Sequence, residues 1–69
     1  MRRSTHEFSE NQGSLDKQIS EFLRARPGTY IVAGPTLSDS SRKIYTADFI
    51  EGDNNIPGYV KDLTAKYRR

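Results

Sequence analysis

Apolar residues along this chain recur first at helical spacing, then in two short extended runs, and then at helical spacing again. The first helical stripe follows a polar stretch, and its members are Leu15, Ile19, Phe22 and Leu23. Ser14 has the side chain of an N-cap, and Pro27-Gly28 would stop the helix and turn the chain. The pattern therefore predicts a helix that begins at Ser14 and ends before Pro27.

Two runs of β-branched and aromatic residues follow, and both predict strands. The first covers residues 29–33, TYIVA, and the second covers residues 43–50, KIYTADFI. Alternation in the second run puts Ala47 and Phe49 on one face, where we expect Phe49 in the core, and Asp48 marks the opposite face as the wetter one. The polar loop between the runs is short enough that antiparallel pairing of the two strands is the simplest arrangement.

A last periodic stretch predicts a second helix that begins at or just after Pro57. Residues 1–13 contain few apolar side chains besides Met1 and Phe8, so we expect a flexible N-terminal tail. The predicted fold class is α+β: a single small domain over residues 14–69, in the order helix-strand-strand-helix. We expect a two-stranded antiparallel hairpin with both helices packed on one face.

A two-stranded sheet leaves two exposed edges, and an isolated hairpin is marginal in water. One solution is a dimer in which like edges pair about a two-fold axis and complete a four-stranded sheet. The other is a monomer whose edges are blunted by two charged side chains and a proline: Lys43, Asp48 and Pro35. The sequence leaves both arrangements open.

Composition narrows the functional classes. The chain has 69 residues, no Cys and 33% hydrophobic residues, so a large enclosed active-site cavity does not fit. Without Cys there is no disulfide framework and no thiolate zinc site, and the longest apolar run has only four residues. We therefore expect a cytoplasmic protein that does not bind a membrane.

Candidate catalytic and metal-binding residues are few. His6 is the only histidine and lies in the expected tail, where nothing would orient its ring. Oxygen-bearing side chains gather late in the chain, but their spacing matches no calcium loop and is typical of turns: Asp48, Glu51, Asp53, Asn54 and Asn55. Residues 34–43 offer hydroxyls and cations for a phosphate but carry no nucleotide-binding signature. We expect no enzyme activity, no cofactor and no metal.

The leading hypothesis is a small regulatory or adaptor module that binds another protein or a second copy of itself. An exposed strand edge offers main-chain hydrogen bonds, and alternate side chains on an apolar sheet face give selectivity. We predict that strand residues form this protein-binding surface: Tyr30, Val32, Ile44, Tyr45 and Thr46.

Charge placement supports a second hypothesis, a nucleic-acid-associated regulator. Five of the eleven basic residues lie in the first three and last four positions, whereas residues 4–65 carry six Lys or Arg against nine Asp or Glu. Basic ends of this kind can contact phosphates in a salt-dependent way that ignores base sequence. The candidate phosphate contacts are Arg2, Arg3, Arg42, Lys43, Lys66, Arg68 and Arg69.

Overall fold

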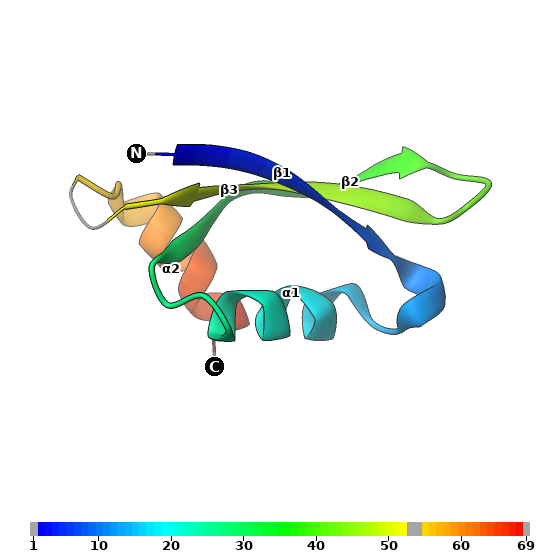
Figure 1. Cartoon of the computed structure of the whole chain (residues 1–69), viewed down its shortest axis with the longest axis horizontal. Coiled ribbons are helices and arrows are strands. Elements are labelled where there is room, and N and C mark those ends of the chain that lie inside the picture. Colours follow the sequence, from blue (N-terminus) through cyan, green and yellow to red (C-terminus); the bar gives the residue numbers. More distant parts are fainter. Residues whose placement is uncertain (1, 53–54, 69) are drawn as a thin grey trace.

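The computed structural model describes residues 2–52 and 55–68, which form a three-stranded antiparallel sheet with two α-helices. Strands and helices follow in the order β-α-β-β-α, with a short 3-10 helix after the first strand. Their bounds are β1 Arg2–Ser9, η1 Glu10–Gln12, α1 Leu15–Arg24, β2 Thr29–Asp39, β3 Ile44–Glu51 and α2 Gly58–Tyr67. β3 lies in the middle of the sheet between β1 and β2, and α1 lies below the sheet in Figure 1.

The N-terminal segment, predicted as a flexible tail, forms β1 and pairs with β3 along its whole length. Period-two alternation explains the strand, because Ser4, His6 and Phe8 share one face and Phe8 is buried on it. The predicted helix-strand-strand-helix order and two-stranded hairpin are therefore wrong, since a further strand precedes α1. A four-stranded sheet made from two hairpins is wrong for the same reason.

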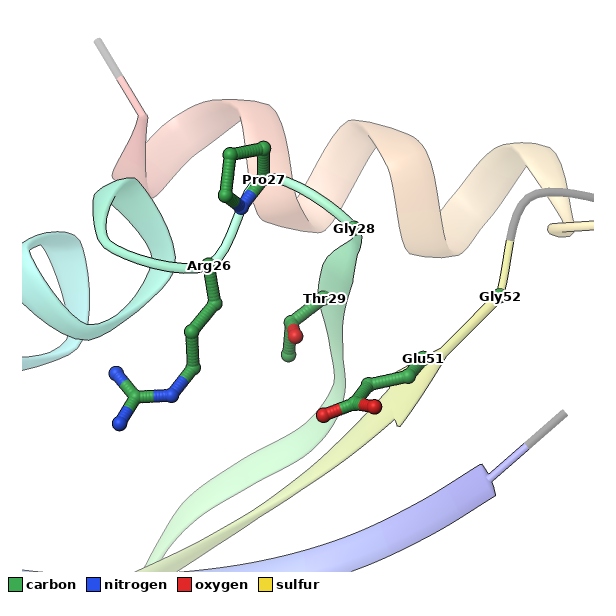
Figure 2. Close-up of a pocket in the computed structure, with 6 residues that line it drawn as sticks. All are labelled: Arg26, Pro27, Gly28, Thr29, Glu51 and Gly52. Carbon is green, nitrogen blue, oxygen red and sulfur yellow. The ribbon is translucent and has the colours of Figure 1, made fainter.

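The ends of the two helices agree with the sequence pattern. Ser14 is the N-cap of α1, and its side chain accepts a hydrogen bond from the backbone N–H of Lys17. The chain leaves α1 through a turn at Pro27 and Gly28 and enters β2 directly afterwards (Figure 2). Pro57 is the N-cap residue of α2, so the predicted start of the second helix is confirmed.

β2 is longer than predicted, because residues 34–39, expected in a loop, continue the strand. Its pairing with β3 carries three register shifts, whereas the pairing of β1 with β3 carries none. Gly34 lies at one of these shifts with φ +94°, and a Cβ there would lie 2.7 Å from the carbonyl oxygen of Thr46. Glycine thus allows the two backbones to approach closely at an irregular point of the strand.

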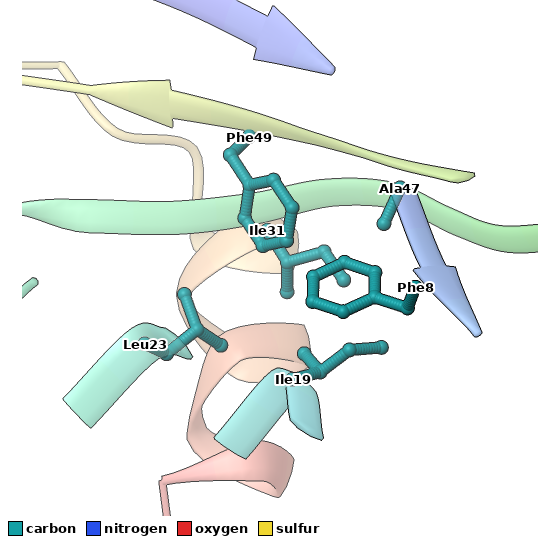
Figure 3. Close-up of a cluster of buried hydrophobic side chains, with 6 residues drawn as sticks. All are labelled: Phe8, Ile19, Leu23, Ile31, Ala47 and Phe49. Carbon is teal, nitrogen blue, oxygen red and sulfur yellow. The ribbon is translucent and has the colours of Figure 1, made fainter. Parts of the chain in front are cut away.

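The main core lies between the sheet and α1 (Figure 3). Its buried members come from all three strands and from α1: Phe8, Ile19, Leu23, Ile31, Ala47 and Phe49. Four partly buried side chains pack around them: Leu15, Phe22, Leu63 and Tyr67. The apolar stripe predicted for α1 and the core position predicted for Phe49 are therefore confirmed.

α2 crosses the outer edge of β2, so the prediction that both helices lie on one face is wrong. Its second half packs against the main core through Leu63 and Tyr67. The segment before α2 and its first turns pack instead into a second cluster, formed by Ile50, Ile56 and Val60 and bordered by Tyr30 and Val32. Ile50 directly follows Phe49 in β3, so the two clusters lie on opposite faces of the sheet.

Candidate functional site

The main-chain groups of β1 divide into an inward and an outward set. The backbone N–H of Glu10 donates to the carbonyl of Lys43 at 3.0 Å, so every second residue before Glu10 bonds inward to β3. These inward residues are Phe8, His6 and Ser4. The main-chain groups of the residues between them point away from the sheet. We call this outward row, at Arg3, Thr5 and Glu7, the open edge.

The outer edge of β2 is covered in its first half by side chains of α2. The backbone N–H of Ile31 donates to the hydroxyl of Thr64 at 3.0 Å, in a buried site. Arg68 follows α2, and its Nη2 donates to the carbonyl of Thr29 at 2.6 Å. The same nitrogen donates to the carbonyl of Arg26 at 3.0 Å, beyond the end of α1. We call this the closed edge, because the N–H of Ile31 and both main-chain groups of Thr29 are already bonded.

Ser9 follows the open edge, and its outward carbonyl is the bonded one. The carbonyl of Ser9, the last residue of β1, accepts a hydrogen bond from Nε2 of Gln18 on α1 at 2.8 Å. Within residues 2–52 and 55–68, no group bonds to the outward main-chain atoms of Arg3, Thr5 and Glu7. Their side chains are exposed as well. Three alternate residues of a regular strand therefore present free donors and acceptors.

A groove runs beside the open edge, between β1 and α1. Its volume is about 440 Å³, and it is lined by aromatic rings and long polar side chains: Phe8, Gln12, Gln18, Glu21, Phe22 and Arg26. The guanidinium of Arg26 lies over the ring of Phe22, 4.0 Å from the ring centre. A strand added to the open edge would direct alternate side chains into this groove.

The side chains of the open edge lie on the face opposite α1, and Asp48 of β3 holds two of them. Nη2 of Arg3 lies 2.8 Å from Oδ2 of Asp48, and the hydroxyl of Thr5 donates to Oδ1 at 2.7 Å. The hydrogen bond from Arg3, followed by that from Thr5, lowers the pKa of the Asp48 carboxyl below its usual range. Asp48 therefore fixes two edge side chains while 65% of the Arg3 side chain stays exposed.

His6 is packed into the structure, so the expectation that nothing would orient its ring is wrong. Its ring lies 4.6 Å from that of Phe22 and 5.6 Å from that of Phe49, measured between ring centres. Nε2 of His6 lies 3.4 Å from the hydroxyl of Ser4. The ring thus extends the aromatic part of the main core toward the open edge.

Four of the five predicted protein-binding residues, Tyr30, Val32, Ile44 and Thr46, lie on the face of the sheet opposite α1, whereas Tyr45 lies on the α1 face. Ile44, Tyr45 and Thr46 lie in the central strand, where β1 and β2 pair on both sides. Tyr30 and Val32 border the second cluster, beside the start of α2. The regular open edge lies in β1, in a segment that the apolar pattern did not single out.

The candidate phosphate contacts are spread over separate parts of the molecule. Arg2 and Arg3 lie in β1, Arg42 and Lys43 in the turn between β2 and β3, and Lys66 and Arg68 at the end of α2, while Arg69 lies outside the described residues. Figure 1 shows the start of β1 and the β2–β3 turn at opposite ends of the sheet. Arg3 and Arg68 already bind Asp48 and main-chain carbonyls. The fold does not gather these cations into one patch.

The late oxygen-bearing residues do not converge on a metal in the described part of the chain, where no three His, Cys, Asp or Glu side chains are suitably grouped. Asp53 and Asn54 lie outside that part. In the loop predicted as a phosphate site, the Asp39 carboxylate accepts from the hydroxyl of Ser41 at 2.7 Å. This bond is the main cause that lowers the pKa of Asp39, and the backbone N–H of Arg42 adds to it. Asp39 thus stabilises the turn that follows it.

A second hollow lies where α1 turns into β2, next to the end of β3 (Figure 2). Its volume is about 390 Å³, and its lining is Arg26, Pro27, Gly28, Thr29, Glu51 and Gly52. The side chains of Arg26 and Glu51 extend into the same space from either side of Thr29. The two opposite charges balance each other, so the hollow indicates no particular class of ligand.

Comparison of the chain with protein-family models, with curated proteins and with solved structures finds no match. In residues 2–52 and 55–68, no helix is long and apolar enough to span a bilayer. The difference between the open and closed edges is therefore the structural feature on which a functional proposal rests.

Proposed function

We propose that this protein is a small non-enzymatic binding module that takes an extended segment of a partner protein along its open edge. The observation that carries the proposal is the row of outward main-chain groups at Arg3, Thr5 and Glu7. Strand addition at such an edge draws its affinity from main-chain hydrogen bonds. The proposal keeps the protein-binding function predicted from the sequence and moves its site to β1.

The regularity of β1 supports strand addition. β1 keeps one register against β3 from Arg2 to Ser9, so its outward groups are evenly ordered along the edge. Proteins commonly protect an edge with bulges or with a covering element, and β2 has both. The edge of β1 has neither along Arg3, Thr5 and Glu7, which makes it the more suitable template for another strand.

The side chains around the open edge define the partner strand that fits best. On the face opposite α1, the strand would meet the cation of Arg3 and the anion of Glu7. On the α1 side, it would meet the ring of Phe22 in the groove. We expect a partner segment with an acidic residue opposite Arg3, a basic residue opposite Glu7 and an apolar side chain directed toward Phe22.

Nucleic-acid binding is the alternative proposal, and the structure offers it less support. Its cations lie on separate elements, and two of them, Arg3 and Arg68, already bind groups of this chain. Titration of a labelled mixed-sequence duplex at low and at about 0.5 M salt tests it, because phosphate contacts weaken steeply with salt. A salt-sensitive complex that Arg42→Ala and Lys43→Ala weaken would favour this alternative.

A displayed library of random peptides, each about as long as the eight-residue β1, tests strand addition directly. We expect selected peptides to shift the amide resonances of Arg3, Thr5 and Glu7 more than those of Ile31, whose N–H is already bonded. Thr5→Pro removes an outward N–H without removing a main-chain bond to β3, and should abolish peptide binding.

Thr5→Val is the matched control for Thr5→Pro, because it keeps the main-chain donor and the shape of the side chain. Peptide binding should survive in Thr5→Val at close to the original affinity. Failure to select any peptide, or equal binding by the Thr5→Pro and Thr5→Val variants, would overturn the proposal. Resonance shifts confined to α2 would do the same.

A further inference from the structure

We infer that a second copy of this chain is a partner of the open edge, and that two copies of β1 pair antiparallel about a two-fold axis at Thr5. This inference rests on the proposed function, because it names the partner of the same site. It would join two three-stranded sheets into one continuous sheet of six strands. The evidence for this inference is the order of the side chains along β1.

The open edge is complementary to itself in this register. With the axis at Thr5, each Arg3 lies directly opposite Glu7 of the second copy, and the two Thr5 residues face each other. Arg3, Thr5 and Glu7 also have their main-chain groups directed outward, so each of these pairs can exchange main-chain hydrogen bonds. Two ion pairs and a ladder of main-chain bonds therefore form together.

Other registers that preserve the hydrogen-bonding pattern are less favourable. An axis at Arg3 places two guanidinium groups opposite each other, and an axis at Glu7 places two carboxylates opposite each other. Like charges directly across a strand pair are destabilising. An axis at His6 pairs Thr5 with Glu7 and leaves Arg3 without a carboxylate across the axis. The register centred on Thr5 is the one that places opposite charges face to face.

Asp48 prepares the edge for this contact. It holds Arg3 through Nη2 and Thr5 through the hydroxyl, so both side chains are ordered before a partner arrives. The guanidinium has five N–H donors, and the bond to Asp48 occupies one nitrogen. The remaining donors can bind Glu7 of the second copy, and less side-chain entropy is lost on association because Arg3 is already placed.

Molecular mass by light scattering over a wide concentration range, combined with charge reversal, tests the inference. The unmodified chain should change from monomer to dimer as concentration rises. Arg3→Glu and Glu7→Arg should each remain monomeric, because each creates two like-charge pairs at the axis. An equimolar mixture of the Arg3→Glu and Glu7→Arg variants should recover the dimer, since opposite charges again face each other. Asp62→Arg, an exposed charge reversal on α2, should dimerise like the unmodified chain.

A cross-linking measurement covers the case in which Arg3→Glu fails to fold beside Asp48. The chain has no Cys, so Thr5→Cys introduces a single thiol at the axis. Cα atoms of a hydrogen-bonded antiparallel pair lie about 5.5 Å apart, which is within disulfide reach. Thr5→Cys should form a covalent dimer on mild oxidation, whereas Asp62→Cys should form little.

The outcomes separate this inference from the proposed function. A chain that stays monomeric at all concentrations, a dimer that persists in Glu7→Arg, or a failure of Thr5→Cys to cross-link would overturn self-pairing. If selected peptides still shift the amide of Thr5 in that case, strand addition stands and only the identity of the partner is wrong. If neither peptides nor a second copy use the open edge, both proposals fail.

Discussion

The two outer strands of this sheet pair with the same central strand, yet their outer edges differ: main-chain groups are bonded on one edge and free on the other. β2 begins under α2, where Thr64 accepts from the N–H of Ile31 and Arg68 donates to the carbonyl of Thr29. β1 presents the same kinds of groups at Arg3, Thr5 and Glu7 without a partner in the described part of the chain. The protein thus closes the first half of one edge with its own helix and leaves the other edge accessible at Arg3, Thr5 and Glu7.

This difference shows that the exposure of β1 is not a general consequence of the size of the chain. Arg68, which closes β2, also contacts other elements. It donates to the carbonyl of Leu23 in the last turn of α1 and to that of Arg26 beyond the helix, and it lies over the ring of Tyr30, 5.3 Å from its centre. The residue that follows α2 therefore closes an edge, binds the end of α1 and covers an aromatic ring. On the β1 side, the corresponding contact is the bond from Gln18 to Ser9.

The largest expected effect comes from disturbing the contact between β2 and β3. In Gly34→Ala, the added methyl would lie 2.7 Å from the carbonyl oxygen of Thr46, at a residue with φ +94°. We expect the free energy of unfolding to fall by about 3 kcal/mol, from backbone strain and steric overlap together. Urea unfolding measures this change. Gly28→Ala is the control, because its new methyl meets nothing within 4 Å and should leave stability unchanged or slightly raised.

A smaller effect should follow from opening the closed edge. Thr64→Val keeps the shape of the side chain but leaves the buried N–H of Ile31 without its acceptor. We expect a loss of about 1–3 kcal/mol in the free energy of unfolding. Amide exchange at Ile31 should become faster in Thr64→Val and stay slow in Thr64→Ser, which keeps the hydroxyl. Unchanged exchange at Ile31 in Thr64→Val would show that Thr64 does not protect this edge.

The local elements were predictable from the sequence because short-range chemistry determines them. Ser14 and Pro27 bound α1, and the alternation around Phe49 places it in the core, as the structure confirms. These signals need only neighbouring residues. The start of α2 was predictable in the same way from Pro57.

β1 and the closed edge could not be predicted with the same rules, because their stability comes from residues far away in the sequence. Phe8 is the single large apolar residue of β1, and it is buried against side chains that come later in the chain. The alternation of Ser4, His6 and Phe8 with more polar, exposed residues was a weak strand signal, because the segment as a whole has few apolar side chains. The role of Arg68 at the edge of β2 depends on how α2 crosses the sheet, which no local pattern specifies.

The smallest expected effect is a change in the free energy of unfolding with pH. It distinguishes the two edges best, because one edge depends on a carboxylate and the other does not. The pKa of Asp48 is lowered in the folded chain by Arg3 and Thr5, so its contribution to stability is present above the pKa of the unfolded chain and disappears as pH falls through the folded value. Asp48→Asn should therefore be less stable than the unmodified chain near neutral pH, and the gap should close in strong acid. The closed edge relies on hydrogen bonds made by Thr64 and Arg68, and neither side chain carries a carboxyl group. The stability gap of Thr64→Val should consequently stay constant as pH falls, and urea unfolding of both variants across the acid range compares the two edges directly. A gap for Asp48→Asn that persists unchanged in strong acid would mean that the carboxylate does not hold the open edge.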